Sequence, residues 1–220
     1  KVGAILHSAK GAWRAGAGWV SVAPLSEEMM PPLPSAYTYE KFALKGTIDG
    51  DELMKFIDTR RVKAVLIGPG TMKNPLSARL LQRLSIAQKK SGLRLIFDAG
   101  ALDQFLHLAK GLEFDPDHTL LTPHPGEWKK LSPDVGEIRS MADIYRLQTQ
   151  LKGFSVIYKS STPIVLHPER AIFLAGGDNR LARAGSGDTL AGIILGLSAV
   201  PRPIDELAAL AQTLMRQSLS

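Results

Sequence analysis

The spacing of apolar residues divides the chain into helical and extended segments. Apolar side chains that recur every three or four residues predict a helix, and short apolar runs between turn residues predict buried strands. The helical pattern covers residues 3–17, 51–59, 75–90, 101–110, 142–152, the part of 181–197 after Gly185, and a last helix with Ile204, Leu207, Leu210 and Leu214 on its buried face. The strand pattern covers residues 19–24, 62–70, 93–100, 118–128, 154–160, 163–168 and 171–176.

Strands and helices alternate through most of the chain. This order is typical of a three-layer α/β/α fold, in which helices cover both faces of a mostly parallel sheet. No internal repeat or linker divides the 220 residues, so we expect a single domain over 1–220. We also expect Asn74 and Pro75 to start the third helix, and Gly111 to end the fourth.

Four of the expected strands end in turns that carry glycine, proline or polar side chains. The turns are Gly68-Pro69-Gly70, Asp98-Ala99-Gly100, Pro123-His124-Pro125-Gly126-Glu127 and Lys159-Ser160-Ser161. In open parallel sheets, ligands bind beyond the carboxyl ends of the strands. The four turns are therefore expected to line one crevice.

Composition narrows the class of protein. Hydrophobic residues make up 45% and charged residues 22%, as in an ordinary globular protein. No apolar run reaches the ~20 residues of a membrane span, and the start lacks the pattern of a signal peptide. The absence of cysteine excludes disulfides and thiolate chemistry, so a cytoplasmic location is the simplest expectation.

The net charge of +6 comes from basic residues that are scattered along the chain. A nucleic-acid groove would need clustered basic residues. The charge therefore favours a small anionic ligand over a nucleic acid or a membrane as the partner.

The cluster Gly185-Ser186-Gly187-Asp188 stands at the start of an apolar helix. A helix start carries unpaired N–H groups and a partial positive charge, and glycines let a phosphate approach them. The acid could then accept a proton. Alternatively, Ser186 or Asp188 only caps the helix and the glycines form a turn.

The other turn residues also have two interpretations each. His124 lies between two prolines and close to Glu127, which favours a functional role, although Glu127 could instead complement a helix dipole. Gly68 and Gly70 form either a simple turn or a floor for a flat ligand. Asp98 is expected to cap the following helix, and Lys159 to be solvated or to reach a phosphate.

In this order, the motifs resemble the ADP/ATP-dependent NAD(P)H-hydrate dehydratases of the ribokinase-like superfamily. The resemblance covers nearly the whole chain and rests on residues 3–23, on the sequences LIGPG and LTPHPGE, and on ARAGSGDTLAGIILGL. Sugar and vitamin kinases of the superfamily have Pro-Asn-x-x-Glu at positions 123–127. His124 and the Pro-Gly that follows it favour the dehydratases.

The resemblance implies an enzyme that repairs hydrated NADH or NADPH. Such enzymes use ADP or ATP to phosphorylate the added hydroxyl and then expel phosphate. Asp188 is the implied catalytic base, and Mg²⁺ is implied by the phosphate chemistry, with Glu127 at a position linked to the metal. Implied substrate contacts are Ala4, Gly70, His124 and Asp188. Implied nucleotide contacts are Lys159, Ser160, Ser161, Thr162, Pro163, Gly185 and Gly187.

The chain departs from the family pattern at two turns. The family usually has Asp-Ala-Asp where Asp98-Ala99-Gly100 stands, and Lys-Gly-x-x-Thr where residues 159–163 read Lys-Ser-Ser-Thr-Pro. A kinase for a small molecule and a non-catalytic nucleotide-binding protein therefore remain as alternatives. The family also has a strand before its first helix, so we expect residues to be missing before Lys1. It further implies a homo-oligomer, with a tetramer as one form.

Overall fold

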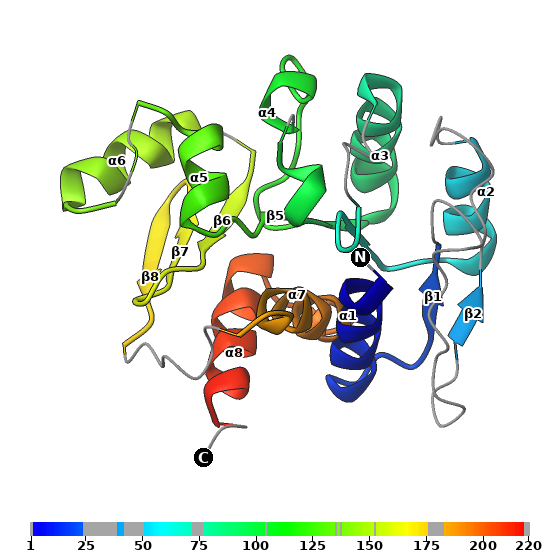
Figure 1. The fold of residues 1–220 in the computed structure, drawn as a ribbon. Coiled ribbons are helices and arrows are strands. Elements are labelled where there is room, and N and C mark those ends of the chain that lie inside the picture. Colours follow the sequence, from blue (N-terminus) through cyan, green and yellow to red (C-terminus); the bar gives the residue numbers. More distant parts are fainter. Residues whose placement is uncertain are drawn as a thin grey trace.

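A six-stranded sheet forms the middle layer of the molecule (Figure 1). Its strands lie in chain order: β3 (Ala64–Ile67), β4 (Arg94–Phe97), β5 (Thr119–Leu121), β6 (Ser155–Tyr158), β7 (Ile164–His167) and β8 (Arg170–Phe173). The first four are parallel, and β7 and β8 add an antiparallel edge. The computed structural model describes residues 2–23, 39–41, 51–71, 77–103, 105–134, 136, 138–151, 153–175 and 183–217.

Helices cover both faces of the sheet, which confirms the predicted three-layer fold (Figure 1). One layer contains α2 (Asp51–Arg60), α3 (Ala78–Ser91), α4 (Phe105–Leu108), α5 (Pro125–Leu131) and α6 (Met141–Gln150). The other contains α1 (Val2–Arg14), α7 (Ser186–Leu197) and α8 (Ile204–Gln217). No helix in the described ranges is long and apolar enough to cross a membrane.

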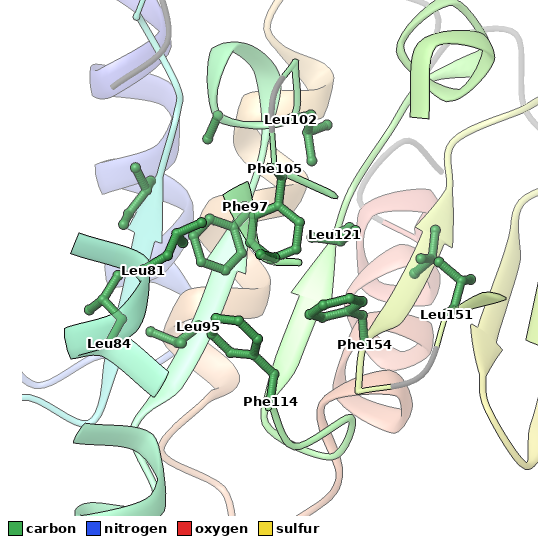
Figure 2. Packing of buried hydrophobic residues seen from close by; sticks show 14 of the residues in the cluster. Leu81, Leu84, Leu95, Phe97, Leu102, Phe105, Phe114, Leu121, Leu151 and Phe154 are labelled. Atoms are coloured by element: carbon green, nitrogen blue, oxygen red, sulfur yellow. The ribbon is translucent and has the colours of Figure 1, made fainter. Parts of the chain in front are cut away.

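The core follows the alternation of side chains along each strand. Phe97 faces α3 and α4, where its ring centroid lies 4.4 Å from that of Phe105 (Figure 2). Phe105 also packs edge-on against Phe154, at 5.1 Å. Ile96 points to the opposite face and packs in a second buried cluster, which includes Ile194 of α7. The strands β4, β5 and β6 are therefore buried on both faces, which explains their mostly apolar sequences, whereas β3 is only partly buried.

Helices α1 and α7 pack unusually closely, because three glycines lie at their contact. A Cβ at Gly192 would lie 2.1 Å from the carbonyl oxygen of Ser8, and one at Gly196 would lie 2.2 Å from that of Ala12. On α1, a Cβ at Gly11 would lie 2.6 Å from the carbonyl of Thr189. The small residues of the α7 sequence therefore place its start against α1.

A second, two-stranded parallel sheet is formed by β1 (Val20–Val22) and β2 (Tyr39–Lys41). A groove of about 570 Å³ separates it from the main sheet. Strands β1 and β3 line its two sides, and Phe56 of α2 and Leu195 of α7 contribute from the two helical layers. The groove therefore lies in the layer of the strands.

Two of the expected helices differ from the structure. Helix α3 begins at Ala78, because the Ser77 side chain caps it by accepting a hydrogen bond from the backbone N–H of Leu80. A start at Pro75 is therefore wrong, and Asn74 and Pro75 lie outside the described residues. The helix expected over 101–110 is present but shorter, because the chain first forms a 3-10 turn, η2 (Ala99–Ala101), and then α4. The burial of Leu102 and Phe105 sets this path.

Candidate active site

The ends of three neighbouring strands place Gly68, Asp98 and Thr122 side by side. In the sheet register, Ile67 pairs with Phe97, and Phe97 pairs with Leu121, so the next residue of each strand stands at the carboxyl edge. Gly68 has a φ of 123°, and a Cβ there would lie 1.7 Å from the carbonyl oxygen of Asp98. This close approach explains why position 68 is glycine. The role of Gly68 and Gly70 as a surface that a flat ligand contacts stays a prediction.

Asp98 and Lys159 form a buried ion pair at this edge. The Lys159 ammonium nitrogen lies 2.7 Å from Oδ1 of Asp98, and their side chains are 16% and 3% exposed. The Thr122 hydroxyl donates a hydrogen bond of 2.6 Å to the same oxygen. Asp98 makes no side-chain capping bond to η2, so its expected role as a helix cap is wrong. Lys159 is likewise not solvated.

The first turn of α7 is open at its N-terminus. Gly185 is the N-cap, with a φ of 88° and no capping side chain, and the Ser186 hydroxyl donates instead to the carbonyl of Arg183. Capping by Ser186 or Asp188 is therefore wrong. The N–H groups of Gly187 and Asp188 lie in the first turn, where a helix offers them no carbonyl partner.

Asp188 lies half-buried in the first turn of α7, where Asp98, Lys159 and His7 influence its carboxyl. Burial raises the pKa of its carboxyl above the usual 3.8, and the negative charge of Asp98 raises it further. Lys159 and His7 lower it, but less. A carboxyl whose pKa is raised holds a proton more strongly, as a general base requires.

Glycines bring an ammonium group and an imidazole ring close to the start of α7. A Cβ at Gly187 would lie 3.3 Å from the ammonium nitrogen of Lys159. A Cβ at Gly185 would lie 2.9 Å from Nε2 of His7, on α1. The helix start therefore combines unpaired N–H groups, an ammonium and an imidazole, which are groups that bind phosphate.

His124 caps α5 through its ring. Its Nδ1 accepts hydrogen bonds from the backbone N–H groups of Gly126 and Glu127, at 3.0 and 3.3 Å. Glu127 completes the capping box, because its Oε2 accepts from the N–H of His124 at 2.9 Å. With Nδ1 as the acceptor, the neutral ring carries its proton on Nε2. The helix-start alternative for Glu127 is confirmed, and substrate contact by His124 stays a prediction.

Glu127 does not belong to a preformed set of metal ligands among the described residues, so its contact with a metal stays a prediction. Its Oε2 is occupied by the capping bond, and its Oε1 lies 3.5 Å from Nε2 of His124. Across the described ranges, no three acidic or histidine side chains converge on one point. A magnesium ion would therefore need the phosphates of a nucleotide as its main ligands.

The segment 159–163 leads away from the same edge. The N–H of Lys159 donates to the carbonyl of Pro123 at 2.9 Å, next to His124. The Ser160 hydroxyl donates to the carbonyl of Thr162 at 2.6 Å, and Ser161 and Thr162 are exposed. Because Lys159 also reaches Gly187, His124 and the start of α7 lie at the same edge of the sheet.

Helix α1 adds residues that sequence reasoning missed. Ser8 donates a hydrogen bond of 3.0 Å to the carbonyl of Asp188, and His7 packs on Gly185. Ala4 lies one turn before Ser8 on the same face, so it is directed towards the α7 side. Only the polar side chains of His7 and Ser8 in an otherwise small and apolar stretch could have indicated these contacts.

Comparison with known proteins agrees with this geometry. The family model Carb_kinase, described as NAD(P)H-hydrate dehydratase, matches residues 1–219. An ADP-dependent (S)-NAD(P)H-hydrate dehydratase from Xanthomonas campestris is 33% identical over 219 residues, which are 94% of this chain and 71% of the relative. One from Enterococcus faecalis is 33% identical over 145 residues, or 66% of this chain. The chain spans about half of that second relative's length, 49%.

The fold also matches solved structures. A ribokinase-like superfamily protein from Enterococcus faecalis superposes with a TM-score of 0.72 at 27% identity, over 99% of this chain and 75% of that protein. The architecture is therefore that of the ribokinase-like superfamily. Together with the match over residues 1–219, this shows that the chain belongs to the NAD(P)H-hydrate dehydratase family.

Proposed function

We propose that this protein restores NADH or NADPH from the hydrated cofactor, using ADP or ATP as the phosphoryl donor. The observation that carries the proposal is the position of Asp188, a half-buried carboxyl of raised pKa beside unpaired N–H groups. The relatives named above, which are ADP-dependent (S)-NAD(P)H-hydrate dehydratases, support the substrate.

In the first step, Asp188 accepts the proton of the substrate hydroxyl as the oxygen attacks the terminal phosphorus of the nucleotide. The bond to the departing AMP or ADP breaks as the new P–O bond forms. The N–H groups of Gly187 and Asp188 hold the transferring group from one side, and the Lys159 ammonium adds charge. Positioning of this kind supplies most of the catalysis in phosphoryl transfer.

In the second step, the C–O bond to the phosphate breaks and the leaving phosphate takes its electron pair. The neighbouring carbon loses a proton to water, and the double bond of the reduced nicotinamide forms again. Phosphate is a much better leaving group than hydroxide, which is why a nucleotide is consumed. His124, Gly70 and Ala4 are the residues that we expect to contact the substrate.

The nucleotide is expected to bind along residues 159–163 and at Gly185 and Gly187. Gly187 supports this placement, because a side chain there would fill the space above Lys159. Mg²⁺ would enter with the nucleotide and neutralise its phosphates. Pro163 removes one N–H from this segment, so we expect weaker nucleotide binding than in relatives with the usual loop.

The test is to incubate the protein with hydrated NADH or NADPH, Mg²⁺ and either ADP or ATP. We expect the absorbance of the reduced nicotinamide to rise and one phosphate to be released per cofactor. A stable phosphorylated product would indicate a kinase instead. Nucleotide binding without turnover would indicate a non-catalytic member. The homo-oligomer implied by the resemblance stays a prediction, which light scattering can check.

A further inference from the structure

We propose that Asp98 is a positioning residue of the dehydratase reaction: together with Thr122, it holds the Lys159 ammonium beneath the first turn of α7 and balances the charges around Asp188. The proposal rests on the proposed function. It adds a residue that touches neither the substrate nor the nucleotide and acts through Lys159.

The geometry of the ion pair between Asp98 and Lys159 holds the ammonium in one position. Both polar partners of Asp98 meet at its Oδ1, with Lys159 at 2.7 Å and the Thr122 hydroxyl at 2.6 Å. The carboxylate is only 3% exposed, so its charge is barely screened by water. Asp98 and Thr122 directly follow the paired residues of β4 and β5. Because the sheet is rigid, these two side chains have little freedom to move.

Lys159 is therefore held between the sheet and α7. One of its three N–H donors is directed at Asp98, and its nitrogen would lie 3.3 Å from a Cβ at position 187. Any residue larger than glycine at 187 would press on the ammonium. The structure thus keeps a cation directly below the N–H groups that receive the phosphoryl group.

The two members of the pair act on Asp188 in opposite directions. The negative charge of Asp98 raises the pKa of the Asp188 carboxyl, and the positive charge of Lys159 lowers it. His7, on α1, also lowers it. Removal of Asp98 alone should therefore make Asp188 a weaker base, and removal of Lys159 alone should make it hold its proton more strongly.

The experiment compares Asp98→Asn, Lys159→Met and the double variant. Activity is measured from low to neutral pH, and the Asp188 carboxyl is titrated directly by ¹³C NMR without substrate, its signal being assigned with Asp188→Asn. The matched control is Asp103→Asn, because Asp103 is an acid of the same turn region that pairs with Lys130 at the surface. This control has the same change in net charge and should leave activity unchanged.

We expect Asp98→Asn to shift the acid limb of kcat/KM to lower pH, and Lys159→Met to shift it to higher pH. Loss of kcat in Asp98→Asn should reach up to about 100-fold, the cost of a displacement of about 1 Å at a reacting group. The same change in the Lys159→Met background should cost much less kcat, because the ammonium that Asp98 positions is already absent, whereas the direct effect of the Asp98 charge on the acid limb should remain.

Additive losses of kcat with an unmoved acid limb would show that Asp98 only supports the fold, and would overturn the proposal. If Asp98→Asn leaves too little folded protein, the double variant is compared with Lys159→Met, since neither leaves a lysine without its counterion. The NMR titration needs no turnover. It therefore tests the charge arrangement even if the wild-type protein fails to dehydrate the hydrated cofactor, which would count against the proposed function alone.

Discussion

The Ser8 hydroxyl of α1 donates a hydrogen bond of 3.0 Å to the backbone carbonyl of Asp188 in α7. This bond is possible because Gly192, one turn later, brings the two helices into backbone contact. The residue that we propose as the base is thus held through its main chain by another helix, while its carboxyl group stays available. The contact between α1 and α7 should therefore affect both stability and turnover.

Gly192→Ala should weaken the protein and its activity together. The new Cβ would lie 2.1 Å from the carbonyl oxygen of Ser8, which is backbone and cannot rotate away. We expect a loss of about 1–3 kcal/mol in the free energy of unfolding, as for other overpacked contacts, measured by urea denaturation. Gly3→Ala on α1 is the control. Among the described residues, its new Cβ has no neighbour within 4 Å beyond the adjoining part of its own helix. Unchanged or higher stability is therefore expected there, and equal behaviour of both variants would refute the argument.

Asp188→Asn should abolish most of the turnover and keep the fold. The amide has the size of the carboxyl but cannot accept the proton. We expect kcat to fall by roughly 10²–10⁴-fold, the usual contribution of a positioned general base. Nucleotide affinity, measured by calorimetry, should persist or increase, because a negative charge near the phosphates is removed. A variant that keeps a large share of the activity would exclude Asp188 as the base.

The same variant should be more stable than the wild type at neutral pH. The pKa of Asp188 is raised in the folded state, so the folded protein binds more protons than the unfolded chain between the ordinary and the raised pKa. Stability therefore falls as pH rises through this interval, and the penalty remains above it. We expect Asp188→Asn to raise Tm at pH 7, with a difference that disappears below the ordinary carboxyl pKa of 3.8. Asp58→Asn, at an exposed position of α2, should show no such trend.

Arg94 should be important for stability. Its buried guanidinium, at the start of β4, donates to the carbonyls of Ser198, Val200 and Arg202, at 3.0, 2.8 and 2.7 Å, and so binds the chain after α7. Arg94→Met should cost about 2–4 kcal/mol, since each hydrogen bond from a charged group contributes roughly 1.5–3 kcal/mol and methionine retains the packing. Arg79→Met removes an exposed pair with Asp51 and should cost less than about 1 kcal/mol. Similar midpoints of urea unfolding for both would contradict this prediction.

The groove between β1 and β3 should accept a further strand. It is bounded by the edges of both strands and covered by residues of α2 and α7. Helix α1 starts at the carboxyl edge, so a parallel strand leading into it would run through this space. If the protein has residues before Lys1, we expect them to pair with both strands. Hydrogen exchange should then show protected amides in β1 and β3, which removal of those residues exposes. Equal exchange with and without them would argue against this placement.

The sequence was sufficient to predict most of the architecture. Continuous apolar runs identified β3 to β6, of which β4 to β6 are buried on both faces and β3 is partly buried. The glycines at 185 and 187 identified the open start of α7. Ser77 instead of Asn74 as the cap of α3 was not predictable, because both residue types cap helices equally well. The 3-10 turn after β4 depends on how the buried side chains of Leu102 and Phe105 pack. Their packing is determined by the whole core and not by the local sequence.

The ion pair of Asp98 and Lys159 could not be predicted from local sequence patterns. Asp98 and Lys159 are 61 residues apart, so their pairing exists only once β4 and β6 lie in one sheet. Before that, an acid followed by a helical pattern resembles a cap. His7 was missed for a similar reason, because its neighbour Gly185 is near only after α1 and α7 have packed. The roles of His124 and residues 160–163 stay predictions.

Helix α7 is fixed at both ends, by Ser8 at the carbonyl of Asp188 and by Arg94 at the carbonyl of Ser198. It can neither slide nor tilt without breaking one of these bonds, whereas Ser161 and Thr162 lie in an exposed turn that the fold constrains little. Under the proposed function, the base lies in this fixed helix, whereas some of the expected nucleotide contacts, at Ser161 and Thr162, lie in the exposed turn. Substitutions in this turn could therefore change the preferred phosphoryl donor while the position of Asp188 is retained.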